Sequence, residues 1–114
     1  MAFDQDQVNE LKRYYPKLQD AEEGGQSFIL ISEMALPSGC DPQMVDGLLC
    51  PSLRDGYPSR LFFSSKIVHR GRGNNWNADG VVILGRRWWA VSWHTHKNNQ
   101  RLLEMVTTHL QAFK

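Results

Sequence analysis

Two cysteines and four histidines are the residues of this sequence best suited to covalent or acid–base chemistry. A thiol becomes a nucleophile when it is partly exposed and lies near a cation or base that favours the thiolate. Cys40 follows a predicted turn and precedes Asp41, whose carboxylate disfavours a thiolate. Cys50 ends an apolar segment, where a small buried side chain is common. The sequence therefore predicts structural roles for both cysteines, with catalysis as the alternative.

The histidines do not form a motif with a defined chemistry. In an extended strand, His94 and His96 would project from the same side, as two zinc ligands do. A zinc site needs a third or fourth ligand, which only His69 or a cysteine could supply from a distant part of the chain. His109 precedes Leu110 in a predicted helix and is interpreted as a residue of the helix face. Because the sequence also lacks a Ser-His-Asp order and a phosphate-binding loop, we predict no metal and no cofactor.

A short basic segment, residues 69–73, precedes Trp76. Arginines that hold phosphates and an aromatic ring that stacks on a base are typical of sites for single-stranded nucleic acid. The chain carries 13 basic and 12 acidic residues, a formal charge of +1, which does not indicate a nucleic-acid-binding domain. A solvated loop is the favoured interpretation, and no nucleic-acid partner is expected. Trp88, Trp89 and Trp93 form either part of the core or a protein interface, where exposed tryptophans often act as anchors.

These candidates must be positioned by helices at both ends of the chain and by strands between them. Apolar residues at spacings of three and four predict a first helix from Asp4, the N-cap, to near Tyr15, and Gln7 suits a capping box. Strands are predicted at residues 27–36, 44–50 and 60–68, followed by an irregular stretch at 69–80. Residues 81–84 and 87–93 are predicted to form a hairpin about a type II′ turn at Gly85-Arg86. Asn98 or Asn99 is predicted to cap a last helix, which buries Leu103, Val106, Leu110 and Phe113. This order predicts an α+β fold, an antiparallel meander sheet with the N- and C-terminal helices on one face.

The length and composition limit the class of protein. A chain of 114 residues suits one domain, residues 1–114, better than two. No apolar run approaches the roughly 20 residues that span a bilayer, and the acidic, polar start of the sequence is unlike a signal peptide. Two cysteines are too few for a secreted disulfide scaffold. We therefore expect a cytoplasmic protein with no membrane partner.

Several short motifs, taken in order, resemble a known family. Residues 36–39 read Leu-Pro-Ser-Gly, residues 45–49 read Val-Asp-Gly-Leu-Leu, and residues 56–58 read Gly-Tyr-Pro. Residues 89–94, Trp-Ala-Val-Ser-Trp-His, then precede the last predicted helix. This order is similar to that of prokaryotic family E of the ubiquitin-conjugating-enzyme (UBC) superfamily, and the similarity spans residue 28 to the C-terminus. The resemblance implies a UBC-like fold.

The resemblance also implies a part in a bacterial ubiquitin-like modification system, of a kind associated with phage defence. The other components of such a system are an activating enzyme, a ubiquitin-like protein and a deubiquitinase-like metalloprotease. In the superfamily, a cysteine that follows a histidine turn accepts the modifier as a thioester. His69 matches that turn, but the cysteine position falls on Ile83, which cannot form a thioester. The resemblance therefore implies a pseudoenzyme that binds the ubiquitin-like protein or its activating enzyme, with candidate binding residues Arg13, Arg70, Trp76, Trp93 and His94.

Two alternatives stay open at this point. The chain is an active conjugating enzyme if a displaced cysteine, Cys50 or Cys40, lies in a shallow cleft beside His69 or His94. It is an unrelated α+β interaction module with a nucleic-acid-facing loop if its arginines form one basic face. That face would consist of Arg60, Arg70, Arg72, Arg86 and Arg87.

Overall fold

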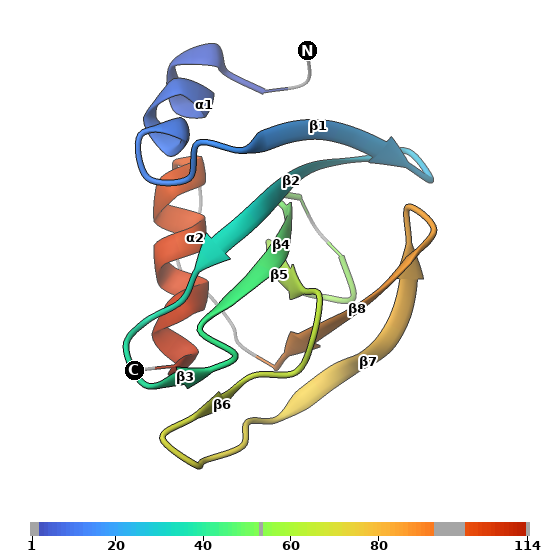
Figure 1. Ribbon diagram of the computed structural model, residues 1–114. Helices are drawn as coiled ribbons and strands as arrows, with labels where there is room; N and C mark the ends of the chain where they lie inside the picture. Colours follow the sequence, from blue (N-terminus) through green and yellow to red (C-terminus); the bar gives the residue numbers. More distant parts are fainter. Residues whose placement is uncertain (1–2, 53, 93–99, 114) are drawn as a thin grey trace.

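The computed structural model describes residues 3–52, 54–92 and 100–113 of the chain (Figure 1). The helices and strands of this part are α1 (Gln5–Lys12), β1 (Leu18–Glu23), β2 (Gln26–Ala35), β3 (Cys40–Asp41), β4 (Met44–Cys50), β5 (Arg60–Phe63), β6 (Val68–His69), β7 (Trp76–Ile83), β8 (Arg86–Val91), α2 (Leu102–Leu110) and a 3₁₀ helix, η1 (Gln111–Phe113). The main sheet of the described part has the strand order β1-β2-β4-β5-β8-β7, and all its neighbouring strands are antiparallel. A separate short ladder pairs β3 with β6. The predicted α+β class with a mostly antiparallel sheet is confirmed.

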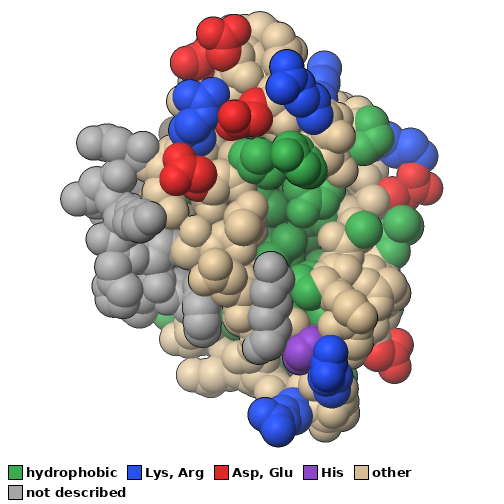
Figure 2. Space-filling model, turned by 90° about the vertical axis from the view of Figure 1, so that its left-hand side faces the viewer, with side chains coloured by type: hydrophobic (Ala, Val, Ile, Leu, Met, Phe, Trp, Pro, Cys, Tyr) green, Lys and Arg blue, Asp and Glu red, His purple; other side chains and the backbone are tan. Residues whose placement is uncertain are grey.

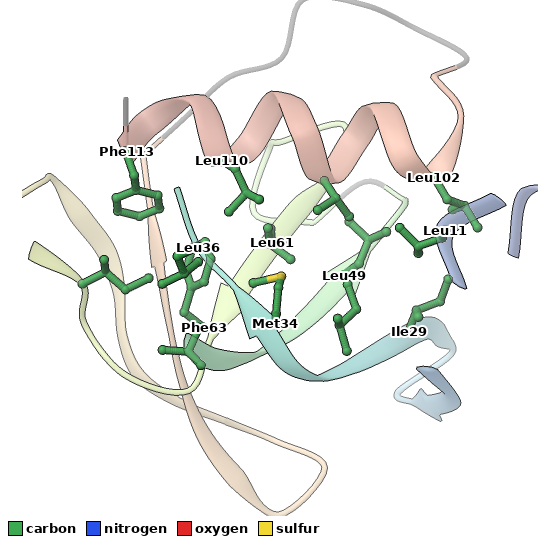
Figure 3. Packing of buried hydrophobic residues seen from close by; sticks show 14 of the residues in the cluster. Leu11, Ile29, Met34, Leu36, Leu49, Leu61, Phe63, Leu102, Leu110 and Phe113 are labelled. Atoms are coloured by element: carbon green, nitrogen blue, oxygen red, sulfur yellow. The ribbon is translucent and has the colours of Figure 1, made fainter. Parts of the chain in front are cut away.

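The helices lie on one face of the sheet, as the sequence predicts. Ile29 and Leu49 on this face share a buried cluster with Leu11 of α1 and Leu110 of α2 (Figure 3). Alternate residues of a strand point to opposite faces, so the next residues along β2, β4, β5 and β8 form a second buried cluster. That cluster contains Phe28, Leu48, Cys50, Phe62, Trp88 and Ala90. Burial on both faces explains why the central strands are continuously apolar in sequence.

The sheet itself encloses the second cluster, because it curls until the β1–β2 and β7–β8 hairpins approach each other (Figure 1). At the hairpin tips, the main-chain N–H of Leu84 donates to the carboxylate of Glu23, with both oxygens 3.2 Å from the nitrogen. The ring of Trp88 is fully buried inside the curl, and its Nε1–H donates to the carbonyl oxygen of Ile83 at 3.0 Å. The curled sheet thus buries its own inner face.

The first helix begins where the sequence predicts, but its capping differs. The carboxylate of Asp4 accepts the main-chain N–H of Asp6 at 2.9 Å, and the helix ends at Lys12. Gln7 does not complete a capping box among the hydrogen bonds of the described residues. Its Oε1 instead accepts the N–H of Leu102, the first residue of α2, at 3.0 Å. A side chain expected to cap its own helix therefore joins the two helices.

The last helix begins later than predicted. Asn98 and Asn99 lie outside the described residues, and the residue that precedes α2 is Arg101, whose N–H donates to the carboxylate of Glu104 at 3.0 Å. The predicted inner residues Val106, Leu110 and Phe113 are buried, but Leu103 is half-buried and Leu102 takes its place.

Strand β1 was not predicted, because its mostly exposed polar side chains resemble a linker. It pairs with β2 through six residues, and Gly24 and Gly25, with φ of 60° and 79°, form the turn between them. The sign of φ at these positions favours glycine. A polar strand at a sheet edge is stabilised by main-chain hydrogen bonds to the neighbouring strand, so its own residues give little indication that it forms a strand.

Three further boundaries correct the sequence interpretation. The predicted strand 60–68 divides, because β5 ends at Phe63 and residues 68–69 pair with β3. The predicted irregular stretch 69–80 is shorter, because β7 begins at Trp76. The β7–β8 turn is formed by Leu84 and Gly85, with φ of 55° and 74°, and not by Gly85-Arg86. Two central residues with positive φ define type I′ and not type II′.

Neither helix of the described part is long and apolar enough to cross a membrane.

Candidate functional site

Two turns meet beside the β3–β6 ladder and line an open cleft of about 710 Å³. In the first turn, the N–H of Cys40 donates to the carbonyl oxygen of Pro37 at 3.3 Å. In the second, His69 and Arg72 exchange two main-chain hydrogen bonds of 3.0 and 2.9 Å, which is the geometry of a two-residue hairpin turn. The cleft is lined by Pro37, Ser38, His69, Arg70 and Arg72.

Gly39 permits the close approach of these two turns. Cys40 pairs with His69 in the ladder, and the N–H of Arg70 donates to the carbonyl oxygen of Gly39 at 2.9 Å. Gly39 has a φ of +91°, and a Cβ atom added there would lie 2.9 Å from Cγ of Arg70 and 3.2 Å from Nε2 of His69. A larger residue would therefore separate the turns or displace both side chains.

His69 is held by a main-chain partner across the cleft. Its Nε2 lies 3.0 Å from the carbonyl oxygen of Ser38. A carbonyl oxygen can only accept, so Nε2 carries the proton and Nδ1 is the ring atom left for a ligand. The half-buried ring is thereby oriented with one nitrogen engaged and the other available.

Arg70 and Arg72 are exposed and, within the described residues, neither forms an ion pair. The cations that do pair with a carboxylate in this part of the chain are Lys17, Arg54, Arg60, Lys66, Arg86 and Arg101. Two unpaired guanidinium groups beside one half-buried imidazole make the cleft electropositive. Such groups favour oxyanions such as carboxylate or phosphate, because guanidinium can donate two parallel N–H groups to two oxygens of the anion.

Both thiols face the interior. Cys40 is 7 % exposed and belongs to the core beneath the helices, and burial raises the pKa of its thiol. It pairs with His69 through the main chain, but its side chain packs into the core. Cys50 is fully buried on the opposite face of the sheet, with its Sγ 3.6 Å from the carbonyl oxygen of Ser52. Neither position has the exposed, cation-stabilised setting of a reactive thiol.

The sequence-predicted binding residues do not form one site. His69 and Arg70 line the cleft, whereas Arg13 is an exposed residue at the C-cap of α1. Trp76 is half-buried at the start of β7, and its ring centre is 6.1 Å from those of Phe63 and of Phe113. The ring of Trp76 thus packs with the core, and only part of it is available to a partner.

The remaining candidates lie either outside the described residues or inside the protein. Trp93, His94 and His96 lie outside the described residues, and no three His, Cys, Asp or Glu side chains within those residues lie together as metal ligands. Trp88 is fully buried. Trp89 is half-buried, with its Nε1–H 2.8 Å from Oδ1 of Asp79. The described tryptophans therefore do not form one exposed patch.

Sequence reasoning missed a buried polar network centred on Arg60. This side chain is 3 % exposed and donates to Oδ2 of Asp55 at 2.9 Å and to the carbonyl oxygen of Val91 at 3.2 Å. It also bonds to Oδ1 of Asn77 and lies 4.3 Å from the ring centre of Tyr57. Three apolar residues, 61–63, follow Arg60 in sequence, and they are the only local signal of its burial. The network fixes the loop before β5 to β7 and β8.

Ser59 and His109 lie beside this network, with Oγ and Nε2 2.9 Å apart. This distance suits a nucleophile and its general base, but both side chains are buried. The pKa of His109 is lowered to about 4, first because burial disfavours the imidazolium and then because the charge of Arg60 repels it. A general base must accept a proton and the nucleophile must be reached by a substrate, so the low pKa and the burial disfavour a catalytic role for this pair.

The five arginines proposed for a basic face do not share one. Arg60 is buried against Asp55, and Arg86 pairs with Asp46 at 3.0 Å. Arg70 and Arg72 lie together at the cleft, whereas Arg87 is exposed on β8 and does not line it. The described structure therefore lacks the continuous arginine face that the nucleic-acid interpretation requires.

Comparison with protein-family models, with curated proteins and with solved structures finds no match to this chain.

Proposed function

We propose that the chain is a non-catalytic component of a bacterial ubiquitin-like modification system, in which it binds the ubiquitin-like protein or its activating enzyme. The motif order that resembles prokaryotic conjugating-enzyme family E supports this assignment. The element order is compatible with it, since α1 precedes a meander of β1, β2, β4 and β5 and α2 follows the sheet. Arginine-lined clefts suit protein partners that carry oxyanions.

The observation that carries the proposal is that both thiols are buried whereas the cleft is accessible. An acceptor thiol must be reached by the partner's thioester carbon, yet Cys40 is 7 % and Cys50 is 0 % exposed. Ile83, at the position that matches the acceptor cysteine, is also buried. The cleft at His69 and Arg70, by contrast, is open to a partner. This arrangement favours binding over transfer.

A thioester assay combined with co-elution tests the proposal. The chain is mixed with a bacterial ubiquitin-like protein, its activating enzyme and ATP, and the products are compared on reducing and non-reducing gels. We expect no reducible adduct on the chain and co-elution with one of the two proteins in gel filtration. A reducible band that disappears in Cys40→Ala or Cys50→Ala would establish a conjugating enzyme instead. Absence of both adduct and co-elution would reject the ubiquitin-like assignment.

A further inference from the structure

The basic cleft continues into an apolar groove beside α2. A hollow of about 250 Å³ is lined by Tyr15, Ala35, Leu36, Pro37, Thr107 and Leu110, and it shares Pro37 with the cleft. Figure 2 shows this face of the molecule, where a recessed strip of hydrophobic side chains runs down to a histidine with Lys or Arg side chains beside it. The two hollows therefore form one groove with an apolar end and a cationic end.

The cationic end is held in a conformation that costs free energy. Arg70 has a φ of 51°, a region in which residues other than glycine and asparagine are disfavoured. The hydrogen bond from its N–H to Gly39 keeps it there. Backbone strain of this kind is concentrated at ligand clamps and similar functional sites. The strained residue here is one of the two arginines that line the cleft, neither of which has an ion-pair partner in the described residues.

The two ends of the groove identify the class of ligand. Carboxylates complement Arg70 and Arg72, and an apolar side chain complements the hollow between Tyr15 and Leu110. A nucleic acid would supply the anions but would leave the apolar end uncovered, and among the described residues no arginine other than Arg70 and Arg72 lines either hollow. A peptide can present both groups within one short extended segment.

We infer that this groove binds an extended acidic segment of a protein partner, with an apolar side chain in the hollow beside α2 and the following carboxylates on Arg70 and Arg72. The inference rests on the proposed function only for the identity of the partner. The apolar and cationic lining of the groove does not depend on that assignment. His69 adds a hydrogen-bonding atom, Nδ1, at the cationic end.

Fluorescence polarisation with a labelled octapeptide, two leucines followed by two glutamates, tests the inference. We expect saturable binding that weakens with salt and falls by about tenfold or more when either arginine is replaced. The variants are Arg70→Asn and Arg72→Gln, since asparagine accepts positive φ more readily than arginine. The unfolding midpoint of Arg70→Asn should be unchanged or higher, which separates lost binding from misfolding. Arg87→Gln, at an exposed arginine outside the groove, is the matched control and should bind as the unchanged chain does.

Changes in the peptide test each end of the groove separately. Replacement of the glutamates by glutamine should abolish binding, and replacement of the leucines by serine should weaken it severalfold. Equal binding of the glutamine peptide, or of the Arg70→Asn and Arg72→Gln chains, would overturn the inference. Binding of a ten-nucleotide oligouridine that depends on both arginines, in place of the peptide, would assign the cleft to nucleic acid.

The same variants distinguish this inference from the proposed function. If the ubiquitin-like protein or activating enzyme co-elutes with Arg70→Asn and Arg72→Gln as it does with the unchanged chain, the groove assignment fails and the proposed function stands. If neither protein co-elutes but the peptide binds in an arginine-dependent way, the groove assignment stands and the proposed function fails.

Discussion

The main-chain N–H of Arg70 donates to the carbonyl oxygen of Gly39 at 2.9 Å, so the turn that carries the free cations is attached directly to the turn that carries Ser38. Each turn is stabilised locally by its own hydrogen bonds. The contact between them is what makes a cleft from two otherwise separate loops.

Substitution of Gly39 should therefore damage the cleft more than an ordinary turn glycine. Gly39→Ala places a Cβ 2.9 Å from Cγ of Arg70 and should cost about 2–3 kcal/mol of unfolding free energy, from the disfavoured φ and from overpacking. Gly24→Ala is the matched control, because Gly24 also has positive φ but nothing lies within 4 Å of its added Cβ. We expect it to cost about 1 kcal/mol. Equal losses in urea unfolding would show that the two turns are not in close contact.

The stability of the protein should fall in mild acid because of His109. Its pKa is about 4 when folded, against about 6.5 in an unfolded chain. Between these values the unfolded state binds a proton that the folded state does not, so stability decreases as the pH falls from 6.5 towards 4. From the folded value of about 4, we expect the unfolding free energy to be about 2 kcal/mol lower at pH 5.0 than at pH 7.5.

His109→Gln provides the control for this pH dependence. Glutamine can retain a hydrogen bond to Ser59 and does not titrate, so the difference between the two pH values should largely disappear in urea unfolding. An undiminished difference in His109→Gln would mean that another group causes it.

Replacement of Arg60 should be strongly destabilising. Arg60→Met removes the buried guanidinium and leaves the buried carbonyl oxygen of Val91 without this donor, which should cost about 2 kcal/mol. It should also raise the pKa of His109, because the repelling cation is gone, and this shift is measurable from the ring signals in an NMR titration. Arg87→Met, at an exposed position, should change the stability by about 0.5 kcal/mol or less. Similar losses in both variants would contradict the buried network.

The thiols should be unreactive in the folded protein. Cys40 and Cys50 are buried, so labelling by a thiol reagent should require opening of the fold and should be about a hundredfold slower or more in buffer than in urea. Mass spectrometry of the labelled peptides assigns each rate to one cysteine. Rapid labelling of Cys40 in the folded state would favour the displaced-cysteine enzyme over the binding protein.

The sequence alone was sufficient to predict the features that depend on residues close together in the chain. The N-cap at Asp4, the strand bounds at Met44–Cys50 and the burial of Cys50 follow from capping chemistry and apolar runs. Residues 28–31 of β2 and 48–50 of β4 are apolar at every position, because successive residues contribute to opposite cores. The UBC-like arrangement and the ubiquitin-like partner stay predictions.

Tertiary structure decided the features that depend on distant partners. Strand β1 exists because β2 supplies its hydrogen bonds, and Gln7 caps the helix that begins at Leu102. The site depends on tertiary structure in the same way. Cys40 pairs with His69 across nearly thirty residues of chain, and this pairing brings Ser38 to Arg70. The sequence by itself determined which residues are polar, cationic or apolar, but only the folded chain determined which cations are paired, because an ion pair depends on distance in space.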